Sequence, residues 1–569
     1  MTRHVSHRRR GQALVMVTLA LIAMFSIIGL AVDLGWSYFT RKAQRAAAEA
    51  AALAAVTETL NIIGPGGTYT CGGHGATCAP APVACPGAAG NLTSACLYAS
   101  LNGFAAGANT AVTVQASDRV TPPTVTGCSP LVNHPPTAPC VDTPYWVTVR
   151  VSQSVPQLFS GVLGNSMGTV SARATAAVAK SLVIGSLILL NRQGESGPYA
   201  TGNNLHLGGS PNVIARGGIL MASNDRAAGY INGSGTVTAP FTYIRTGGDI
   251  AGKTGQWQDP PENRPDGSGF YDPFRGMGQP PLNPNQASLP YIAVPGGTLS
   301  CASVCQPGNY YATSNGRPSG QPITIAGDGS FANGATGSTA FGDYVFFGGL
   351  SIGHATVNFG PGRYVLAGAL SGKLLWDSSN QAQLYGGSAT NPDAGRIFIL
   401  TDSSYGGALS AVAAAVPGGL PALTFGGTEF KAGSNSKSKV DLYGLNPEST
   451  LLPANLANFA PVVMWQDQAN SNVKYTSSGD IDTSCGSLDK PCTNPTSPAR
   501  ELNFWAGQDA HWGGAIYQPR GAWSVVHATP GYKGALQIVT GAMDLQGSGD
   551  LELTSPTHPI ERYVAALVE

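Results

Sequence analysis

Charged residues are scarce in this sequence. Its 569 residues include 31 basic and 31 acidic side chains, so charged residues make up 11% and the formal net charge is zero. A typical soluble domain has about 25% charged residues. Because no basic surplus is available to follow a phosphate backbone, the composition argues against nucleic-acid binding. The 75 glycines and 41 prolines stay below the roughly 25–30% that is typical of disordered chains. We therefore expect folded units, and the length favours two or more.

The sequence also lacks the motifs of several kinds of site. Its glycine-rich stretches carry no Lys-Ser/Thr of a phosphate-binding loop, and no calcium-binding nonapeptide occurs. The stretch GLSIG at Gly349–Gly353 matches the GxSxG nucleophile motif, but HATVNFG follows it and reads as a strand. That motif needs a helix at this point. We expect no enzyme activity, no cofactor and no metal site.

One polar stretch, GQDAHWGG, is a candidate for ligand binding. It places Asp509 and His511 beside Trp512, with Glu501 nearby. An aromatic ring beside acidic groups could stack on a sugar. The alternative is a His–Asp hydrogen bond in a polar turn, and the sequence favours this second interpretation.

The ten cysteines predict disulfides. Their number is even, the CxxC pairs of zinc sites are absent, and the nearby His74 and His134 stand alone. Disulfides indicate an oxidising compartment. The sequence predicts local pairs between Cys128 and Cys140, Cys301 and Cys305, and Cys485 and Cys492. Pairing among Cys71, Cys78, Cys85 and Cys96 stays open.

A long uncharged segment, Gln12 to Val32, predicts a membrane helix. About 20 helical residues cross the roughly 30 Å core of a bilayer. Arginines precede the segment and orient its N-terminus towards the cytoplasm. Trp36 and Tyr38 follow at the depth of the membrane interface. A cleavable signal has a shorter apolar region of about 7–15 residues, so we expect an uncleaved anchor rather than a removed signal.

An alanine-rich stem follows the anchor. The residues from Arg41 to Thr59 have high helix propensity. Small residues recur along it at helical spacing, a pattern that lets another helix approach closely. These residues are Ala43, Ala47, Ala50, Ala51 and Ala54. Either the stem is a solvated extension of the membrane helix, or it packs against partner helices in an assembly.

The N-terminal sequence resembles the TadE/TadG-like Flp pilus-assembly proteins. The resemblance rests on RRRGQALVMVTLALIAMFSIIGLAVDLG, the following Tyr and basic pair, and QRAAAEAAALAA, in which Glu49 replaces an Asp common in the family. YWVTVRVSQSVPQLFSGVLGNSMGTVSARATAAV extends the likeness to about Lys180, and the C-terminal half is only loosely similar. The resemblance implies a role in pilus assembly. Processing of the related pilins requires a glutamate five residues after the cut glycine, and Met16 stands there after Gly11.

The rest of the chain predicts a mainly-β domain. We expect a cytoplasmic tail at 1–11, a transmembrane helix at 12–40, a small α+β unit with cysteine-rich loops at 41–180, and a glycine-rich β domain at 181–569. Val147, Val149 and Val151 alternate with polar residues and predict a strand with one buried face. The pairs Leu536/Ile538, Met543/Leu545 and Leu551/Leu553 alternate in the same way, each before a glycine-containing corner. Such short apolar runs with glycine corners favour a right-handed parallel β-helix, with a β-sandwich as the alternative. The element PGxY occurs at Pro307 and Pro361. Prolines at 256–290 predict a linker or long surface loop.

These features together predict a structural envelope protein. We expect a single-pass protein of the cytoplasmic membrane, with its C-terminal bulk outside, that serves Flp/Tad-type pilus assembly or surface adhesion. Its expected partners are other pilus-assembly or envelope proteins, met through the N-terminal helix. A surface polysaccharide is a further expected partner. The alternative is an anchored β-helix protein that binds or degrades carbohydrate.

Overall fold

The protein was analysed as a computed structural model, in which the chain divides into two compact units. Unit 1 comprises Met1–Ser181, Phe274–Met277 and Arg562–Glu569, and unit 2 comprises Leu182–Pro273 and Gly278–Glu561. The structure describes residues 10–64, 67–72, 76–119, 143–157, 167–183, 185–190, 204–224, 226–264, 272–274, 277–301, 304–331, 341–368, 374–378, 381–387, 393–401, 407–421, 429–432, 438–466, 502–505, 509–526, 532–556 and 558–568.

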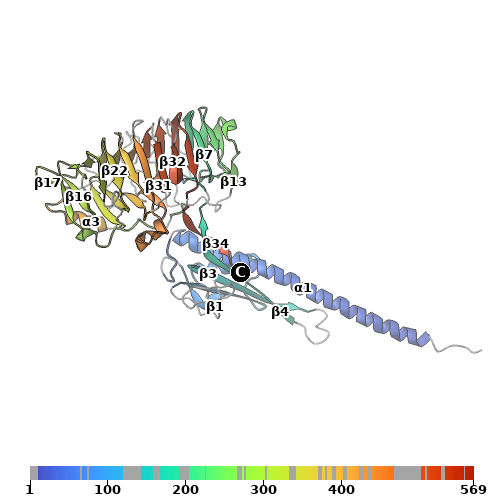
Figure 1. The fold of residues 1–569 in the computed structure, drawn as a ribbon. Coiled ribbons are helices and arrows are strands. Elements are labelled where there is room, and N and C mark those ends of the chain that lie inside the picture. Colours follow the sequence, from blue (N-terminus) through green and yellow to red (C-terminus); the bar gives the residue numbers. More distant parts are fainter. Residues whose placement is uncertain are drawn as a thin grey trace, which may run out of the picture. The chain divides into compact units, whose positions relative to one another are not determined.

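Unit 1 is dominated by one long helix. Helix α1 (Arg10–Ile63) has 54 residues and is drawn in blue in Figure 1. At 1.5 Å per residue it is about 80 Å long. The predicted membrane segment and the predicted stem therefore form one continuous helix, in which no proline occurs. A second helix, α2 (Leu92–Leu101), follows a short turn of 3-10 helix, η1 (Cys85–Gly87).

A five-stranded sheet completes unit 1. Its strand order is β1-β2-β3-β4-β34, and the first three neighbouring pairs are antiparallel. The strands are β1 (Ala79–Ala84), β2 (Thr110–Asp118), β3 (Tyr145–Pro156), β4 (Met167–Leu182) and β34 (Glu561–Leu567). Val147, Val149 and Val151 are fully buried, as their alternation with polar residues predicts.

The last strand was missed by the sequence analysis, which placed all of residues 181–569 in one β domain. Residues Arg562–Glu569 belong to unit 1, where β34 extends the sheet beyond β4. The amide of Val568 donates a hydrogen bond to the carbonyl of Thr175 at 2.9 Å. A strand pattern of seven residues carries no information about which distant strand it pairs with, so the pattern could not reveal this.

The alanine-rich part of α1 packs into the core of its own unit. Ala47, Ala48, Ala51, Ala52 and Ala55 are completely buried with residues of α2, β2 and β3. Small side chains let the helix approach the sheet closely. Of the predicted packing stripe, Ala47 and Ala51 lie in this core, whereas Ala43, Ala50 and Ala54 are half-buried at its edge. The fully buried part of the stripe therefore packs within this chain, and only the remainder borders solvent.

A buried polar network joins the helices to the sheet. Asn91 donates hydrogen bonds to the hydroxyls of Thr59 and Tyr145, each at 2.8 Å, and the Tyr145 hydroxyl donates to the Thr77 carbonyl at 2.7 Å. Burial raises the pKa of Tyr145 to about 12. Two disulfides, Cys71–Cys78 and Cys85–Cys96, close the neighbouring loops. They settle the pairing that the sequence left open.

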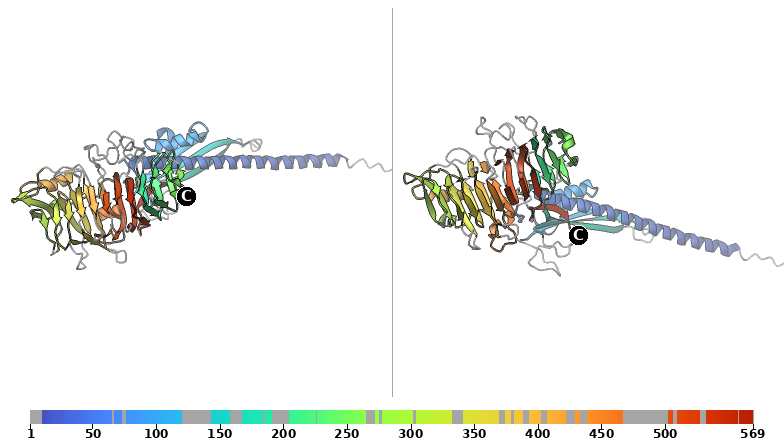
Figure 2. Two further views of the ribbon diagram at one scale, coloured as in Figure 1. Left: turned by 90° about the horizontal axis from the view of Figure 1, so that it is seen from above. Right: turned by 45° about the horizontal axis from the view of Figure 1, so that its top comes forward.

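Unit 2 is built almost entirely from parallel strands. Most strands pair with the strand about three positions later in the chain. Each group of about three consecutive strands therefore forms one row, and successive rows stack on one another (Figures 1 and 2). Among the described residues of unit 2, one antiparallel pairing occurs, between β17 (Arg317–Pro318) and β16. Short helices lie between the rows: η3 (Thr254–Gln256), η4 (Gln286–Ser288), α3 (Ala408–Ala414) and η6 (Ala454–Phe459).

The strands of successive rows form three ladders, each a series of strands in which every strand pairs with the next. The first contains β14 (Tyr291–Pro295), β16 (Gly308–Ser314), β20 (Gly342–Phe347), β23 (Gly362–Ala367), β26 (Arg396–Thr401), β29 (Val462–Gln466), β5 (Leu187–Leu189), β8 (Ile219–Met221), β11 (Thr242–Arg245) and β13 (Glu262–Arg264). The second contains β15 (Thr298–Leu299), β18 (Ile323–Ile325), β21 (Leu350–Ile352), β24 (Leu374–Ser378), β27 (Glu429–Ala432), β30 (Leu502–Trp505), β6 (Leu205–Gly209), β9 (Gly229–Ile231) and β12 (Ile250–Gly252). The third contains β19 (Gly329–Phe331), β22 (Thr356–Phe359), β25 (Gln383–Gly386), β28 (Lys439–Tyr443), β33 (Leu551–Thr554), β7 (Asn212–Ala215) and β10 (Thr236–Thr238).

Two long strands pass through more than one ladder. These are β31 (Asp509–Val526) and β32 (Tyr532–Gly547), and they pair with each other over both of the first two ladders. Strand β32 also pairs with β5 and β6, which come some 340 residues earlier in the chain. Figure 1 shows this join, where the red β32 lies near the green β7. The first rows of unit 2 therefore stack directly on its last ones.

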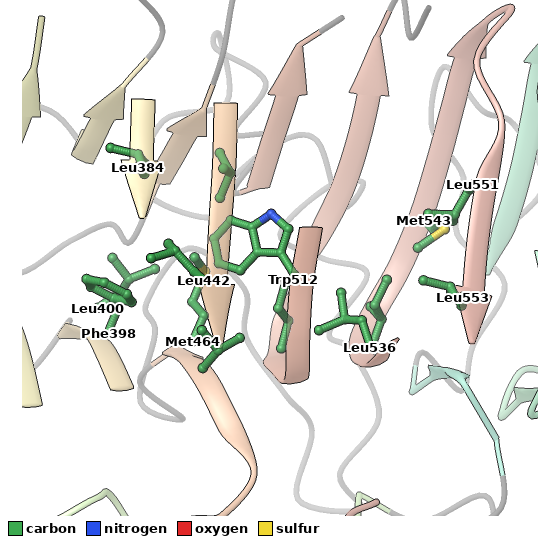
Figure 3. Close-up of a cluster of buried hydrophobic side chains, with 14 of the residues drawn as sticks. Leu384, Phe398, Leu400, Leu442, Met464, Trp512, Leu536, Met543, Leu551 and Leu553 are labelled. Atoms are coloured by element: carbon green, nitrogen blue, oxygen red, sulfur yellow. The ribbon is translucent and has the colours of Figure 1, made fainter. Parts of the chain in front are cut away.

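In-register side chains fill the interior of unit 2. One such line on the first ladder is Tyr344, Tyr364, Phe398, Met464, Ile516, Ile538, Leu187 and Ile219. All of them are at most 1% exposed, and burying a side chain of this size stabilises the fold by roughly 1.5–3 kcal/mol. The rings of Tyr344 and Tyr364 stack at 4.8 Å. Figure 3 shows the same interior around Phe398, Met464 and Trp512.

The predicted alternation of apolar residues is confirmed in one stretch of the chain. Leu536 and Ile538, Met543 and Leu545, and Leu551 and Leu553 all belong to this core. They enter it from the first, second and third ladder in turn, and Figure 3 shows four of them.

The repeated PGxY element has a physical explanation. In both copies the tyrosine is buried, and its hydroxyl donates to the carbonyl four residues earlier. Tyr310 bonds Gln306 at 2.5 Å, and Tyr364 bonds Gly360 at 2.8 Å. A Cβ atom at Gly362 would lie 2.7 Å from the Gly342 carbonyl oxygen, so this corner requires glycine.

The proline-rich segment crosses the outer side of the first ladder. We call residues 278–289 the strap. Its Gln279 accepts a hydrogen bond from the Trp465 indole at 2.7 Å, and its Asn283 donates to Asp343 at 2.7 Å. Asp343 also pairs with the buried Arg363, whose guanidinium contacts the Pro281 carbonyl. The predicted surface loop is thus held by several successive strands.

Two substitutions of Tyr364 should distinguish what its ring contributes to stability from what its hydroxyl contributes. We predict that Tyr364→Ala lowers the free energy of unfolding by about 3–5 kcal/mol, because it leaves a cavity in the stack. Tyr364→Phe keeps the ring and should cost only about 0.5–1.5 kcal/mol, from the lost hydrogen bond to Gly360. Denaturant unfolding of the full chain measures both. Equal losses for the two variants would contradict the stacking account.

Enlarging a buried alanine of α1 should destabilise unit 1. We predict that Ala51→Leu costs about 1–3 kcal/mol through overpacking, whereas Ala46→Leu on the exposed side of the helix changes stability by less than about 0.5 kcal/mol. Thermal unfolding in detergent measures the difference. A stable Ala51→Leu protein would show that this alanine does not pack against its own sheet.

Candidate functional site: an apolar helix and a cationic cavity

The first half of α1 exposes an unbroken apolar surface. Large hydrophobic side chains are exposed from Leu14 to Phe39, with Leu14 at 72%, Phe25 at 58% and Phe39 at 65%. These 26 residues correspond to about 39 Å of helix, close to the ~40–45 Å of a bilayer with its headgroups. Helix α1 is long and apolar enough to cross a membrane.

Two hydroxyls within this segment are satisfied by the helix itself. The Thr18 hydroxyl donates to the Leu14 carbonyl and the Ser26 hydroxyl to the Ile22 carbonyl, each at 2.8 Å. In hydrocarbon no water is available for such groups, and an unsatisfied one is costly. Near the end of the segment, the Asp33 side chain is only 5% exposed, and the Ser37 hydroxyl accepts a hydrogen bond from the Gln157 amide.

The predicted anchor residues all lie on this part of α1. Gln12 belongs to the first turns of the helix, and its side chain lies outside the described residues. Val32, Trp36 and Tyr38 are exposed by 45%, 52% and 64%. The rings of Trp36 and Phe39 stack with centroids 6.1 Å apart. An aromatic group therefore ends the apolar surface, as is typical of a membrane interface.

A cavity of about 530 Å³ follows directly beyond these aromatics. Helix α1 contributes one wall, and strands β3 and β4 contribute the other. The lining residues are Tyr38, Arg41, Lys42, Arg45, Arg150, Ser171, Ala172 and Arg173. Five of these eight side chains are cationic and none is acidic. In a chain with zero net charge, this is a marked local concentration of positive charge.

The cations of the cavity are only weakly compensated. Arg150 and Arg173 stand directly opposite each other on β3 and β4, a placement that is unfavourable for like charges. Within the described part of the chain, Arg41 and Arg173 form no hydrogen bond or ion pair. Arg45 pairs with Glu49 at 2.9 Å on the helix surface, and the Lys42 ammonium lies 5.6 Å from the Tyr38 ring centroid.

The sequence did not predict this site. Arg41 and Lys42 stand out in the sequence only as a basic pair after the predicted membrane segment. Arg150 and Arg173 were missed as site residues, although Arg150 occupies a polar position of the alternating strand 147–152. That alternation was the available signal, because it places the Arg150 side chain on the face opposite the core.

Two other clusters of polar or sulfur-containing side chains do not form an open site. Ligand atoms of Cys71, Cys78 and Asp118 lie within 4.8 Å of one another, but the two sulfurs form a disulfide and so offer no thiolate to a metal. His206 and Asp544 form a pair at 2.8 Å between adjacent strands. Both residues are at most 9% exposed, so this pair ties strands together and presents little open surface.

The polar stretch around Trp512 does not form a sugar-stacking site. Trp512 is 1% exposed and points into the core of unit 2 (Figure 3), whereas His511 on the same strand is exposed. Alternate residues of a strand face opposite sides, which separates the two rings. Ser351 of the GxSxG match lies within β21, and β22 follows it where a nucleophile motif would need a helix.

One of the three predicted disulfides lies within the described residues. Cys301 and Cys305 are joined, as predicted. The predicted pairs Cys128–Cys140 and Cys485–Cys492 lie outside the described residues.

Comparison with known proteins identifies the N-terminal segment. Residues 11–58 match the family model described as putative Flp pilus-assembly TadE/G-like. The matched region covers the exposed apolar segment, the three cavity residues of α1 with basic side chains, and most of the alanine-rich helix. No curated protein and no solved structure matches the chain. The comparisons therefore show that residues 11–58 of this protein are similar to the TadE/G-like Flp pilus-assembly family.

Proposed function

We propose that this protein is a membrane-anchored structural component of Flp/Tad-type pilus assembly, with unit 2 and the part of unit 1 that follows the membrane segment outside the cytoplasmic membrane. The observation that carries the proposal is the coincidence of the TadE/G-like match at 11–58 with the exposed apolar surface of α1. The arginines before α1 support a cytoplasmic N-terminus. The three disulfides of the described residues support an oxidising, extracytoplasmic location for the rest.

Unit 2 would serve as a rigid scaffold that presents the surface of this component. Its three ladders of parallel strands support a parallel β-helix, since the chain visits each ladder in turn. A β-sandwich would be built mainly from antiparallel pairs. The continuous in-register core supports the role of a stable scaffold. Partner proteins of the envelope would contact the exposed side of the α1 stem, where Ala46 and Arg45 lie.

A carbohydrate-binding role is the second candidate, and one observation favours it. Asn358, Tyr385, Asp441 and His511 follow one another in register on the third ladder. Such a polar line with an aromatic ring could contact a surface polysaccharide. It includes a single carboxylate, however, whereas glycoside hydrolysis uses a pair. Binding is therefore favoured over degradation within this second candidate.

Deletion of the gene tests the pilus assignment. We predict loss of Flp pili in electron micrographs and loss of surface attachment, both restored by the wild-type gene. A variant with Phe25→Arg should fail to restore them, because a charge in the middle of a membrane helix costs roughly 2.5–3.5 kcal/mol on insertion. The matched variant Ala46→Arg, on the exposed stem, should insert normally.

Immunoblots of membrane fractions control for expression of each variant. Normal pili in the deletion strain would contradict the assignment. If such a strain instead lost retention of its surface polysaccharide, the carbohydrate-binding candidate would replace it.

A further inference from the structure

We infer that the cationic cavity of unit 1 binds the phosphate headgroup of an anionic phospholipid from the membrane that α1 crosses. The inference rests on the proposed membrane anchoring and goes beyond it, because it assigns a ligand to the cavity. Two observations support it. The charges that line the cavity are all positive, and the cavity lies directly beyond the exposed apolar surface of α1.

The cavity lies at the level of lipid phosphates. The exposed apolar surface ends at Phe39, after Trp36 and Tyr38, which belong at the interface between hydrocarbon and headgroups. Arg41, Lys42 and Arg45 follow within the next two turns, about 3–9 Å further along the helix axis. Phosphates lie just above such an aromatic belt. A headgroup can therefore reach the cavity while its acyl chains lie along α1.

The walls of the cavity suit a phosphate rather than a neutral group. Guanidinium groups bind phosphate oxygens through two parallel hydrogen bonds. Arg41 lines the cavity from the helix, whereas Arg150 and Arg173 line it from the sheet. The Ser171 hydroxyl, which accepts a long 3.4 Å hydrogen bond from Arg150, adds a further polar group.

The repulsion between cations also points to an anion. Arg150 and Arg173 face each other across neighbouring strands, and both line the cavity. An anion bound between them would relieve their repulsion. The cavity is fixed in shape by its own unit, since the side-chain amide of Gln157 on the β3 side donates to the Ser37 hydroxyl of α1 at 3.2 Å.

A lipid is favoured over an acidic protein segment by the position of Tyr38. This ring forms part of the cavity wall and also belongs to the exposed apolar surface of α1. A ligand that fills the cavity would thus contact both a charged and an apolar region. Phospholipids combine these two chemistries in one molecule.

Lipid retention by the full-length protein tests this inference. The protein is inserted into vesicles of equal parts phosphatidylcholine and phosphatidylglycerol, extracted in a mild non-ionic detergent, and its bound lipids are quantified by mass spectrometry. We predict that the wild-type protein retains phosphatidylglycerol in clear excess. Arg150→Gln with Arg173→Gln should lower this excess about tenfold, because each basic residue contributes to anionic lipid binding.

Two further variants separate charge at the cavity from charge in general. Arg226→Gln with Arg317→Gln removes two exposed cations from unit 2 and should leave retention unchanged. Arg150→Lys with Arg173→Lys keeps the charge and should retain most of the excess. Circular dichroism checks that each variant is folded.

Three results would overturn the inference. The wild-type protein could retain the two lipids equally, or the Arg150→Gln, Arg173→Gln variant could keep the excess of phosphatidylglycerol unchanged. The protein could also bind a polyglutamate peptide selectively instead of lipid. Alkaline carbonate extraction distinguishes these from failure of the proposed function. Release of the wild-type protein by carbonate would contradict anchoring itself, whereas firm retention without lipid selectivity would contradict the cavity assignment alone.

Discussion

The apolar surface of α1 between Leu14 and Phe39 is the constraint on which the functional account depends. Seventeen large hydrophobic side chains are exposed there, far more than a water-soluble helix could carry without aggregating or finding a partner. A bilayer would cover this surface, because its thickness with the headgroups, about 40–45 Å, is close to the ~39 Å of the segment, and its interface suits the aromatic end. In the proposed anchoring, the cations beyond Phe39 lie where lipid phosphates begin.

The second half of the same helix is held by a different interaction. Its alanines contribute little area each, but they let α1 lie close against β2, β3 and α2, and the network around Asn91 fixes this contact. Because α1 is continuous, the sheet of unit 1 is tied rigidly to the membrane segment. The same unit contributes Arg150, Arg173 and Arg41 to the lining of one cavity.

Much of this organisation could be predicted from sequence, and the exceptions have physical causes. Local patterns were sufficient for the membrane segment, the strand at 147–151 and the paired core residues at Leu536, Met543 and Leu551. Long-range pairing was not accessible: no pattern indicates that β34 joins the sheet of unit 1 or that β32 stacks on β5. The stripe of alanines predicted a close contact but not its partner, and Ala47 and Ala51 contact their own sheet. The cavity was missed because its cations come from three separate elements.

The central claim, that α1 crosses a membrane up to Phe39, is tested most directly by labelling single cysteines along the helix. Phe25→Cys and Ala46→Cys place a thiol within and beyond the apolar segment of the full-length protein in vesicles. The account predicts that a membrane-impermeant maleimide labels Ala46→Cys and leaves Phe25→Cys unmodified until detergent is added. Equal labelling of both positions in intact vesicles would contradict it.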